Sequence, residues 1–310
     1  MNDNYIVKTN SLCKRYKKHM ALNGVCMNVA RGDIYGFVGE NGSGKTTIIR
    51  LLCGLIFPTS GDFELFGVSN TSPDILKARA KIGAVVESPS IYLNMSASDN
   101  LRMQCRILGI CANEDKIKQT LELVGLSYLY DDTKNAGSFS LGMRQRLGIA
   151  MALLGDIELL ILDEPMNGLD PQGIVEIREL ILKLNQEKGI TFIISSHILT
   201  ELSLVATKYG IISKGKIIKE ISSAELENEC RRYTLFESDN RGALVSVLAK
   251  KFDADDIEPV PNGAKVFGDV DLNTIVPELV NAGVNITAIN TTKSNIEQYY
   301  LNLIGGGHNA

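Results

Sequence analysis

The amino-acid sequence predicts an α/β protein, and three features of the chain lead to this expectation. Short apolar runs of strand length occur at residues 34–38, 159–162 and 190–194. Each run ends in glycine or polar residues, and helix-compatible stretches lie between the runs. The 310 residues also exceed the usual size of one domain. We therefore expect two domains, residues 1–220 and residues 221–310.

Composition and charge make several classes of protein improbable. Hydrophobic residues form 45% and charged residues 22% of the chain, as in a globular protein with a substantial core. A net charge of −4 leaves no basic excess to neutralise nucleic-acid phosphates. No apolar run reaches the ~18 to 20 residues that cross a bilayer, and no signal peptide opens the chain. The six cysteines form no C-x-x-C pair, so we expect reduced thiols and a cytosolic protein.

The stretch from residue 39 to residue 47, G-E-N-G-S-G-K-T-T, fits the P-loop pattern G-x-x-x-x-G-K-[ST]. It lies between an apolar run and a helix-compatible run, as a phosphate-binding loop requires. Its glycines let backbone N–H groups approach phosphate oxygens, and the next helix adds unpaired donors. We expect Lys45 to reach the β- and γ-phosphates and Thr46 to bind Mg²⁺. The candidate nucleotide-binding residues are Gly39, Glu40, Asn41, Gly42, Ser43, Gly44, Lys45, Thr46 and Thr47.

Strands are also expected on both sides of this loop. Alternating apolar and polar residues between positions 5 and 30 predict antiparallel strands. Tyr16 in this region is either an aromatic platform for adenine or a tyrosine of a basic surface, and its position favours neither. A strand is expected at 62–68, followed by a short helix that Ser72 and Pro73 would open.

A buried strand at 82–86 ends at Glu87, and a helical segment follows it. The Glu87 carboxylate could reach a bound metal, although a solvated strand-end residue is the simpler interpretation. Capping residues at Ser96 and Asn113 predict two helices within an all-helical insertion.

The last helix of the insertion begins at Ser140, a natural N-cap. Gly142 in its first turn leaves backbone N–H groups accessible, so the helix start could bind an anion. A simple capped helix explains the same residues equally well.

Two carboxylates, Asp163 and Glu164, end the apolar run 159–162. Such a pair is costly at a buried strand end unless a cation or proton neutralises it. Asp163 suits a Mg²⁺ partner, and Glu164 is placed to orient or deprotonate a water molecule. His197 follows the run 190–194, where ligands gather in doubly wound folds, so we favour a γ-phosphate contact.

These motifs occur in the order found in ABC transporter ATP-binding cassettes, which the chain resembles over about residues 5–220. The motifs are the P-loop, F-S-L-G-M at 139–143, the run ending in Glu164, N-G-L-D at 167–170, and His197. The resemblance implies a P-loop NTPase with a RecA-like core, an antiparallel β-subdomain and a helical subdomain. It also implies ATP hydrolysis with Mg²⁺.

The resemblance assigns further roles to single residues. Tyr16 would be the A-loop aromatic, Asp163 and Glu164 the Walker B pair, Asp170 the D-loop acid and His197 the switch histidine. It also implies a head-to-tail homodimer in which the signature of one subunit contacts the γ-phosphate held by the other. The signature residues are Ser140, Leu141, Gly142 and Met143.

The chain departs from the usual cassette pattern at two places. The signature is usually L-S-G-G-Q, whereas this chain has F-S-L-G-M. Glu87 replaces the Q-loop glutamine, which keeps an acceptor oxygen for Mg²⁺ or the lytic water but adds negative charge. Both features resemble the bacitracin-resistance and lantibiotic-immunity ATPases, in which an E-loop replaces the Q-loop. This implies a separate permease, contacted by residues 88–100 at the cytoplasmic membrane face, and export or removal of an antimicrobial peptide.

After about residue 220 the pattern alternates between strands and helices. Expected strands lie at 233–237, 257–260, 264–267 and 284–289, and expected helices at 241–251 and 272–282. A last helix would open at Ser294, and the tail through His308 is expected to fray. The β-α-β-β-α-β order suggests a small ferredoxin-like α+β domain.

Two other functions compete with transport. One is a soluble ABC-type ATPase that remodels ribosomes or nucleic acid, although such proteins usually carry two cassettes or long coiled-coil insertions. The other is a small-molecule phosphotransferase, which would have no need for the helix start at Ser140.

Overall fold

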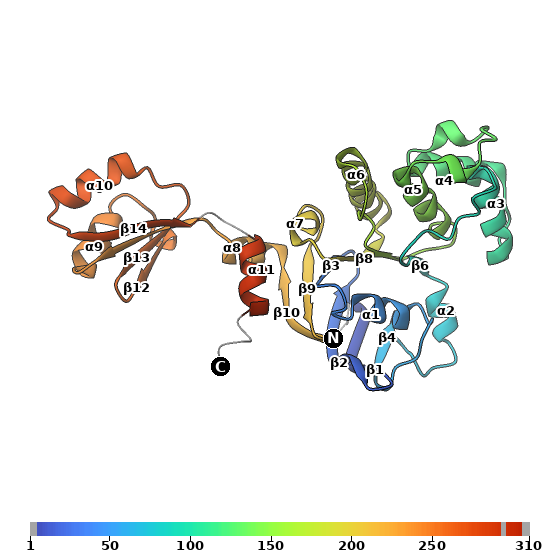
Figure 1. Ribbon diagram of the computed structural model, residues 1–310, viewed down its shortest axis with the longest axis horizontal. Helices are drawn as coiled ribbons and strands as arrows, with labels where there is room; N and C mark the ends of the chain where they lie inside the picture. The colour runs from blue at the N-terminus through green and yellow to red at the C-terminus, as the bar shows by residue number, and fades with distance from the viewer. Residues whose placement is uncertain (1–4, 293–295, 306–310) are drawn as a thin grey trace. The chain divides into compact units, whose positions relative to one another are not determined.

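The structure is a computed structural model that describes residues 5–292 and 296–305 (Figure 1). The chain divides into two units, Met1–Ser223 and Ala224–Ala310. In the described ranges, no helix combines the length and the apolar character needed to span a membrane.

A six-stranded, mainly parallel sheet forms the centre of the first unit. Its strands run in the order β10-β9-β3-β8-β7-β6, and only the β9–β10 pair is antiparallel. The bounds are β3 (Ile34–Val38), β6 (Ile82–Val85), β7 (Leu159–Asp163), β8 (Thr191–Ser196), β9 (Lys208–Ser213) and β10 (Lys216–Ser222). Every residue of β3, β7 and β8 is buried, which explains their nearly continuous apolar sequences. The predicted α/β class is therefore confirmed.

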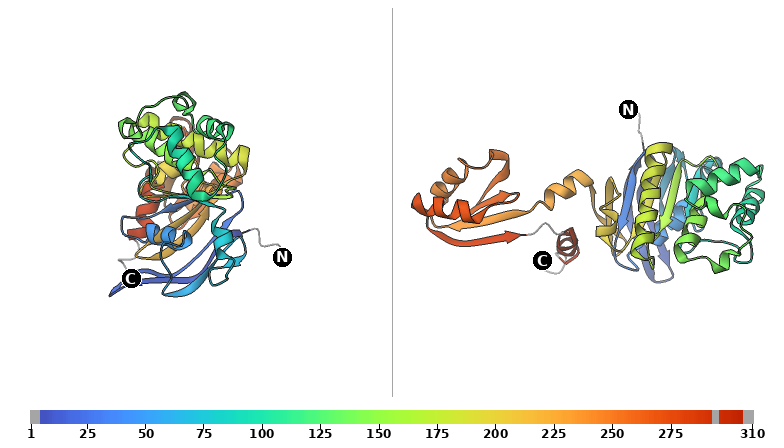
Figure 2. Two further views of the ribbon diagram at one scale, coloured as in Figure 1. Left: turned by 90° about the vertical axis from the view of Figure 1, so that its right-hand side faces the viewer. Right: turned by 90° about the horizontal axis from the view of Figure 1, so that it is seen from above.

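A second, antiparallel sheet packs below α1 (Lys45–Leu52), as Figures 1 and 2 show. Its order is β2-β1-β4-β5, with β1 (Tyr5–Tyr16), β2 (His19–Ala30), β4 (Ser60–Leu65) and β5 (Val68–Ser69). The single strand expected at 62–68 is wrong, because Phe66 and Gly67 have φ values of 52° and 76°. Two positive φ values in succession form the tight turn of a hairpin between β4 and β5.

The helix expected from Ser72 begins later, as α2 (Ile75–Arg79). The Ser72 hydroxyl accepts a hydrogen bond from the backbone N–H of Asp74, only two residues on. The N-cap of α2 is Asp74, so the Ser72 contact belongs to a turn before the helix.

The helical insertion is confirmed and comprises α3 (Ala97–Leu108), α4 (Glu114–Leu123) and α5 (Leu141–Ala152). Single turns of 3₁₀-helix occur at Ser127–Leu129 and Ala136–Ser138. The side chains of Ser96, Asn113 and Ser140 cap the three α-helices as predicted. On the sheet face opposite α1 lie α6 (Pro171–Lys188) and the short α7 (Leu199–Leu202) (Figure 1).

The second unit has the β-α-β-β-α-β order expected from the sequence. Its sheet order is β12-β13-β11-β14, so β13 lies between the two strands of the first βαβ segment. This split βαβ arrangement is ferredoxin-like. The bounds are β11 (Tyr233–Ser238), α9 (Arg241–Leu248), β12 (Ile257–Val260), β13 (Gly263–Phe267), α10 (Leu272–Asn281) and β14 (Ile286–Thr292). A 3₁₀ turn occurs at Ala254–Asp256, and α8 (Ser223–Glu229) and α11 (Ile296–Gly305) flank these elements in sequence.

The hydrophobic core of this unit includes Phe236, Leu244, Val266 and Leu279. The helix expected at 241–251 ends earlier, and the last strand starts and ends later than expected. Ser294 and His308 lie outside the described residues.

Candidate nucleotide-binding site

The phosphate-binding loop connects β3 to α1 in a confined space. Gly44 is the N-cap of α1 with a φ of 117°, a conformation that residues with a Cβ rarely adopt. A Cβ at Gly44 would lie 2.7 Å from Leu22 Cδ2, and a Cβ at Gly39 would lie 2.5 Å from Ile212 O. Both positions therefore require glycine for the loop to keep this path.

Lys45 folds back over the loop that precedes it. Its Nζ donates hydrogen bonds to Gly39 O at 2.6 Å and Glu40 O at 3.3 Å. The residue is only 5% exposed, so its ammonium group is held in the loop rather than in solvent.

The buried Ser43 hydroxyl has no hydrogen-bond partner in the described part of the chain. A buried polar atom without a partner is unusual and suggests that a ligand supplies one. A phosphate oxygen would supply an acceptor, so the loop fits an anionic ligand.

Asp163 links the P-loop helix to the central sheet. Its Oδ2 accepts a hydrogen bond from Thr46 Oγ1 at 2.9 Å, and its Oδ1 accepts one from Ser195 Oγ at 2.5 Å. Ser195 is opposite Asp163 in the parallel β7–β8 register, and both residues are buried.

The hydroxyl of Thr46 and the carboxylate of Asp163 are oxygen donors of the kind that Mg²⁺ prefers. Within residues 5–292 and 296–305, no group of three His, Cys, Asp or Glu residues could hold a metal. Mg²⁺ commonly binds through one or two protein oxygens together with substrate phosphates, so the pair fits this ion.

Glu164 lies between Lys45 and His197. Its Oε1 is 3.4 Å from Lys45 Nζ, and its Oε2 is 2.7 Å from His197 Nδ1. The backbone N–H of Glu164 donates to Ser195 Oγ at 2.9 Å, and the residue has a φ of 50°. A non-glycine residue held in this region indicates local strain, which is common at functional sites.

Glu201 of α7 lies near this pair. Burial raises the pKa of Glu201 above its ordinary value, and the charge of Glu164 raises it further. The charge of His197 and a hydrogen bond with Ser196 oppose these effects. The sequence analysis did not identify Glu201, although it lies only four residues after His197.

A cleft of about 290 Å³ joins the P-loop to the tyrosine expected to contact the base. Its lining residues are Tyr16, His19, Ala21, Asn41, Gly42, Gly44, Lys45, Thr46, Thr47 and Glu164. Tyr16 is 40% exposed, and Lys14 Nζ lies 5.2 Å from the centre of its ring. The cleft thus brings Tyr16 and the P-loop together.

The turn between β9 and β10 supports the phosphate-binding loop from behind. The N–H of Gly215 donates to Ser43 O at 2.9 Å, and Gly215 O accepts from the N–H of Asn23 at 2.8 Å. No sequence motif indicated this support, because the turn is far from the P-loop along the chain.

The remaining predicted residues do not line the cleft. The Glu87 side chain is 61% exposed and forms an ion pair with Arg50. Ser140 Oγ accepts from the N–H of Met143 at 3.2 Å at the exposed start of α5. Asp170 caps α6 by accepting from the N–H of Gly173 at 3.1 Å. Leu141 lies against the turn before α6, since a Cβ at position 168 would be 3.3 Å from its Cδ2.

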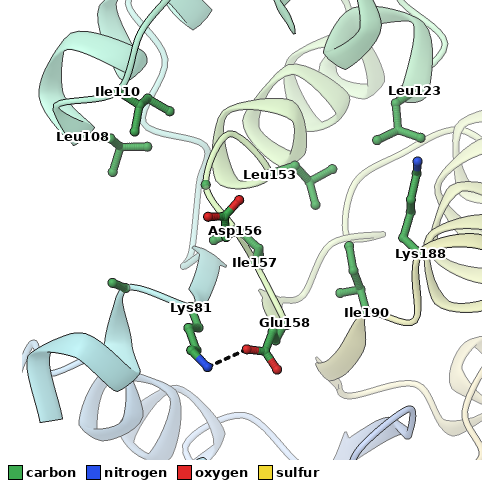
Figure 3. Close-up of a pocket in the computed structure, with 12 residues that line it drawn as sticks. Lys81, Leu108, Ile110, Leu123, Leu153, Asp156, Ile157, Glu158, Lys188 and Ile190 are labelled. Carbon is green, nitrogen blue, oxygen red and sulfur yellow. Dashed lines mark ion pairs between the residues drawn. The ribbon is translucent and has the colours of Figure 1, made fainter. Parts of the chain in front are cut away.

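A larger cavity, of about 800 Å³, lies at the other end of the parallel strands (Figure 3). Most of its walls are aliphatic, from Leu108, Leu123, Leu153 and Ile190 among others. Glu158 at its rim forms an ion pair with Lys81 at 2.7 Å. The residues that line this larger cavity include no glycine-rich loop and no helix start with free backbone donors. The smaller cleft has both and is therefore the better nucleotide site.

Comparisons with known proteins show the family of the chain. The model of the ABC transporter family matches residues 22–167. The bacitracin transport ATP-binding protein BcrA of Bacillus licheniformis is 42% identical over 306 residues, which are 97% of this chain and 98% of that protein. The lantibiotic transport ATP-binding protein SrtF of Streptococcus pyogenes is 43% identical over 235 residues, 75% of this chain and 99% of that protein.

Solved structures give the same result for most of the chain. CbiO1 from Clostridium perfringens, part of the ABC transporter complex CbiONQ, has a TM-score of 0.65 and 30% identity, covering 73% of this chain and 92% of that one. A dimeric bacterial ABC transporter cassette has a TM-score of 0.62 and 25% identity. The match covers 70% of this chain and 98% of that chain. Ribosome or nucleic-acid remodelling is not favoured by these matches. The chain belongs to the ABC transporter family, as an ATP-binding subunit whose ATPase activity is coupled to transport.

Proposed function

We propose that the cleft binds ATP together with Mg²⁺. The adenine stacks on Tyr16, and the phosphates lie along the loop 39–47 with Lys45 against the β- and γ-phosphates. Thr46 and Asp163 hold Mg²⁺, which neutralises part of the phosphate charge. The partnerless hydroxyl of Ser43 and the Thr46–Asp163 contact support this arrangement.

Hydrolysis uses the residues that meet at the ends of β7 and β8. Glu164 polarises the attacking water, and His197 holds the Glu164 carboxylate and contacts the γ-phosphate. The 2.7 Å contact between these two side chains is the observation that carries this assignment. Lys45, 3.4 Å from Glu164, stabilises the charge that develops on the phosphate oxygens.

The active form is a head-to-tail homodimer that closes around two Mg-ATP. Ser140, Leu141, Gly142 and Met143 of one subunit complete the site of the other, and Asp170 lies beside them at the interface. Two observations support this proposal. The signature residues do not line the cleft of their own chain, and a structurally similar cassette is dimeric.

The dimer drives a separate integral-membrane permease from the cytoplasmic face of the membrane. Residues 88–100 contact the permease, and Glu87 acts as a metal ligand or holds the lytic water when the site closes. The transported substrate is an antimicrobial peptide of the bacitracin or lantibiotic type, carried by the permease rather than by this chain. Near full-length identity of 42% to a bacitracin transport ATP-binding protein carries this proposal.

The variant Glu164→Gln tests the catalytic assignment. We expect it to bind ATP and form a stable ATP-bound dimer while losing nearly all turnover. Glu187→Gln, at an exposed position near the end of α6, is the control and should keep normal turnover. Unchanged ATPase activity in Glu164→Gln would exclude Glu164 as the base, and an ATP-bound monomer would refute the dimer.

Survival of cells tests the substrate. Cells that express the chain with its candidate permease are challenged with bacitracin, lantibiotics and unrelated antibiotics, and Glu164→Gln serves as the inactive control. Protection against the peptides that needs active ATPase is expected. Equal survival of the two strains against every peptide would refute the proposed substrate class.

A further inference from the structure

Glu87 is held by a partner that its expected role does not explain. Its Oε1 forms an ion pair with Nη2 of Arg50, which lies in the last turn of α1. The metal-binding pair described above, Thr46 with Asp163, does not contact Glu87. The carboxylate is therefore engaged with the P-loop helix, away from the proposed metal position.

Helix geometry places the two pairs along one line. Thr46 and Arg50 are four residues apart in α1 (Lys45–Leu52), so they project from the same face of the helix. Thr46 holds Asp163, and one turn further along Arg50 holds Glu87. One turn of helix rises about 5.4 Å, so a modest shift of the Glu87 loop would bring it towards the Thr46–Asp163 pair.

The Arg50–Glu87 pair can be broken easily. The side chains are 40% and 61% exposed, and exposed ion pairs contribute little because water screens them. Glu87 has a φ of 64°, which a non-glycine residue rarely adopts without support from its surroundings. An exposed ion pair on a strained residue can open at low cost, so Glu87 could exchange Arg50 for another partner.

The loop that carries Glu87 also packs against the helix that begins at the signature. A Cβ on Gly148 of α5 would lie 2.5 Å from Pro89 Cβ, so loop and helix are in close contact. A small cavity of about 110 Å³ adjoins this contact and is lined in part by Ser88, Pro89 and Gln104. The loop is therefore bordered by a cavity as well as by α5.

We propose that Arg50 is a positioning residue that competes with the bound metal for the carboxylate of Glu87. While the ion pair is intact, Glu87 is withheld from the Thr46–Asp163 pair. When the pair opens, Glu87 becomes an additional oxygen ligand. This inference rests on the proposed Mg-ATP site and adds a residue that determines when Glu87 takes part.

Equilibrium binding tests the competition without relying on turnover. Affinity for a slowly hydrolysed ATP analogue is measured by calorimetry with Mg²⁺ and with a chelator. The dissociation constant with the chelator, divided by the dissociation constant with Mg²⁺, reports the metal contribution. The variants are Arg50→Ala, Arg50→Gln, Arg50→Lys, Glu87→Gln and the double variant Arg50→Ala with Glu87→Gln. A ratio cancels any general loss of phosphate attraction caused by removal of a cation.

A second exposed arginine–glutamate pair provides a matched control. Arg102 and Glu114 have side chains 32% and 54% exposed and lie on the helical insertion. Arg102→Ala should leave the ratio unchanged.

Release of Glu87 should strengthen the metal contribution. We expect Arg50→Ala and Arg50→Gln to raise the ratio about two- to fivefold. This is the change in a dissociation constant that corresponds to the free energy of an exposed ion pair. Arg50→Lys should remain near the unsubstituted protein, and Arg50→Ala should have no effect once Glu87 is glutamine.

Two results would overturn the inference. One is an unchanged ratio in both Arg50→Ala and Arg50→Gln, and the other is an equal rise with and without Glu87. In either case, tight Mg-dependent binding by the unsubstituted protein would leave the proposed site intact. No binding of the analogue by the unsubstituted protein would refute the site itself.

Discussion

Replacement of Ser195 by alanine tests whether the end of β8 orients both carboxylates of the site. Ser195 is fully buried, donates to Asp163 Oδ1 at 2.5 Å and accepts from the N–H of Glu164 at 2.9 Å. Alanine removes both contacts and introduces no new group. The N–H of Glu164 keeps its hydrogen bond to the carbonyl oxygen of residue 195 at 3.2 Å, so the main loss falls on Asp163.

The size of the effect follows from these contacts. A hydrogen bond to a charged group contributes about 1.5–3 kcal/mol, so the free energy of unfolding should fall by about that amount. Domains are stable by roughly 5–15 kcal/mol, so the variant should still fold. Loss of a group that orients a metal ligand lowers metal affinity or activity about 10- to 100-fold, and we expect an ATPase loss in this range.

Thr191→Val is the matched control for this experiment. Thr191 is also fully buried, lies at the start of the same strand, and its hydroxyl accepts from the N–H of Gly32 at 2.9 Å. Denaturant unfolding should show lowered stability in both variants, whereas steady-state ATPase assays should show a large loss only in Ser195→Ala. Full activity in Ser195→Ala, or an equal loss in Thr191→Val, would refute the reasoning.

Three further predictions concern other parts of the site. Lys45→Ala should lose most nucleotide affinity, because Lys45 is the one lysine or arginine among the described residues that line the cleft, and retained tight binding in a titration would contradict the P-loop assignment. Tyr16→Ala should weaken ATP binding by about 1–3 kcal/mol, as for base stacking, while Tyr16→Phe should bind normally. Glu201→Gln should raise thermal stability at pH 7, because a carboxyl whose folded pKa is raised destabilises the fold when ionised. The gain should shrink as pH falls through the raised pKa and vanish below the ordinary carboxyl range, and a gain independent of pH would contradict burial as its cause.

Local chemistry made much of the site predictable from the sequence. The P-loop pattern located Lys45 and Thr46, and the strand-end carboxylates located Asp163 and Glu164. The N-cap Ser140 was also recognisable, because a capping side chain bonds to an N–H only three residues away. Each of these features depends on residues that are close together along the chain.

Contacts between distant segments could not be predicted in the same way. The Ser195–Asp163 contact needs β8 beside β7, and the support of Ser43 by Gly215 needs β9 beside β3. A single sequence does not determine strand order. The Arg50–Glu87 pair has the same origin, since the loop after β6 reaches α1 only in the folded chain.

Some local predictions also failed for a physical reason. The expected long strand was divided by a two-residue turn whose second residue, Gly67, is a common hairpin signal. The expected helix at Ser72 begins later, because Ser72 accepts from the N–H of Asp74 within a turn and Asp74 is the N-cap of α2. In both cases two local structures competed, and neighbouring apolar residues did not distinguish them.

The turn at Gly215 has a consequence for how the site receives its ligand. Its hydrogen bonds to Ser43 and Asn23 hold the backbone of the phosphate-binding loop through contacts that lie within the chain. Ordering a mobile residue opposes association by about 1–2 kcal/mol at 25 °C. A loop that such contacts hold in place loses less entropy on binding, so more of the attraction to phosphate is available as affinity.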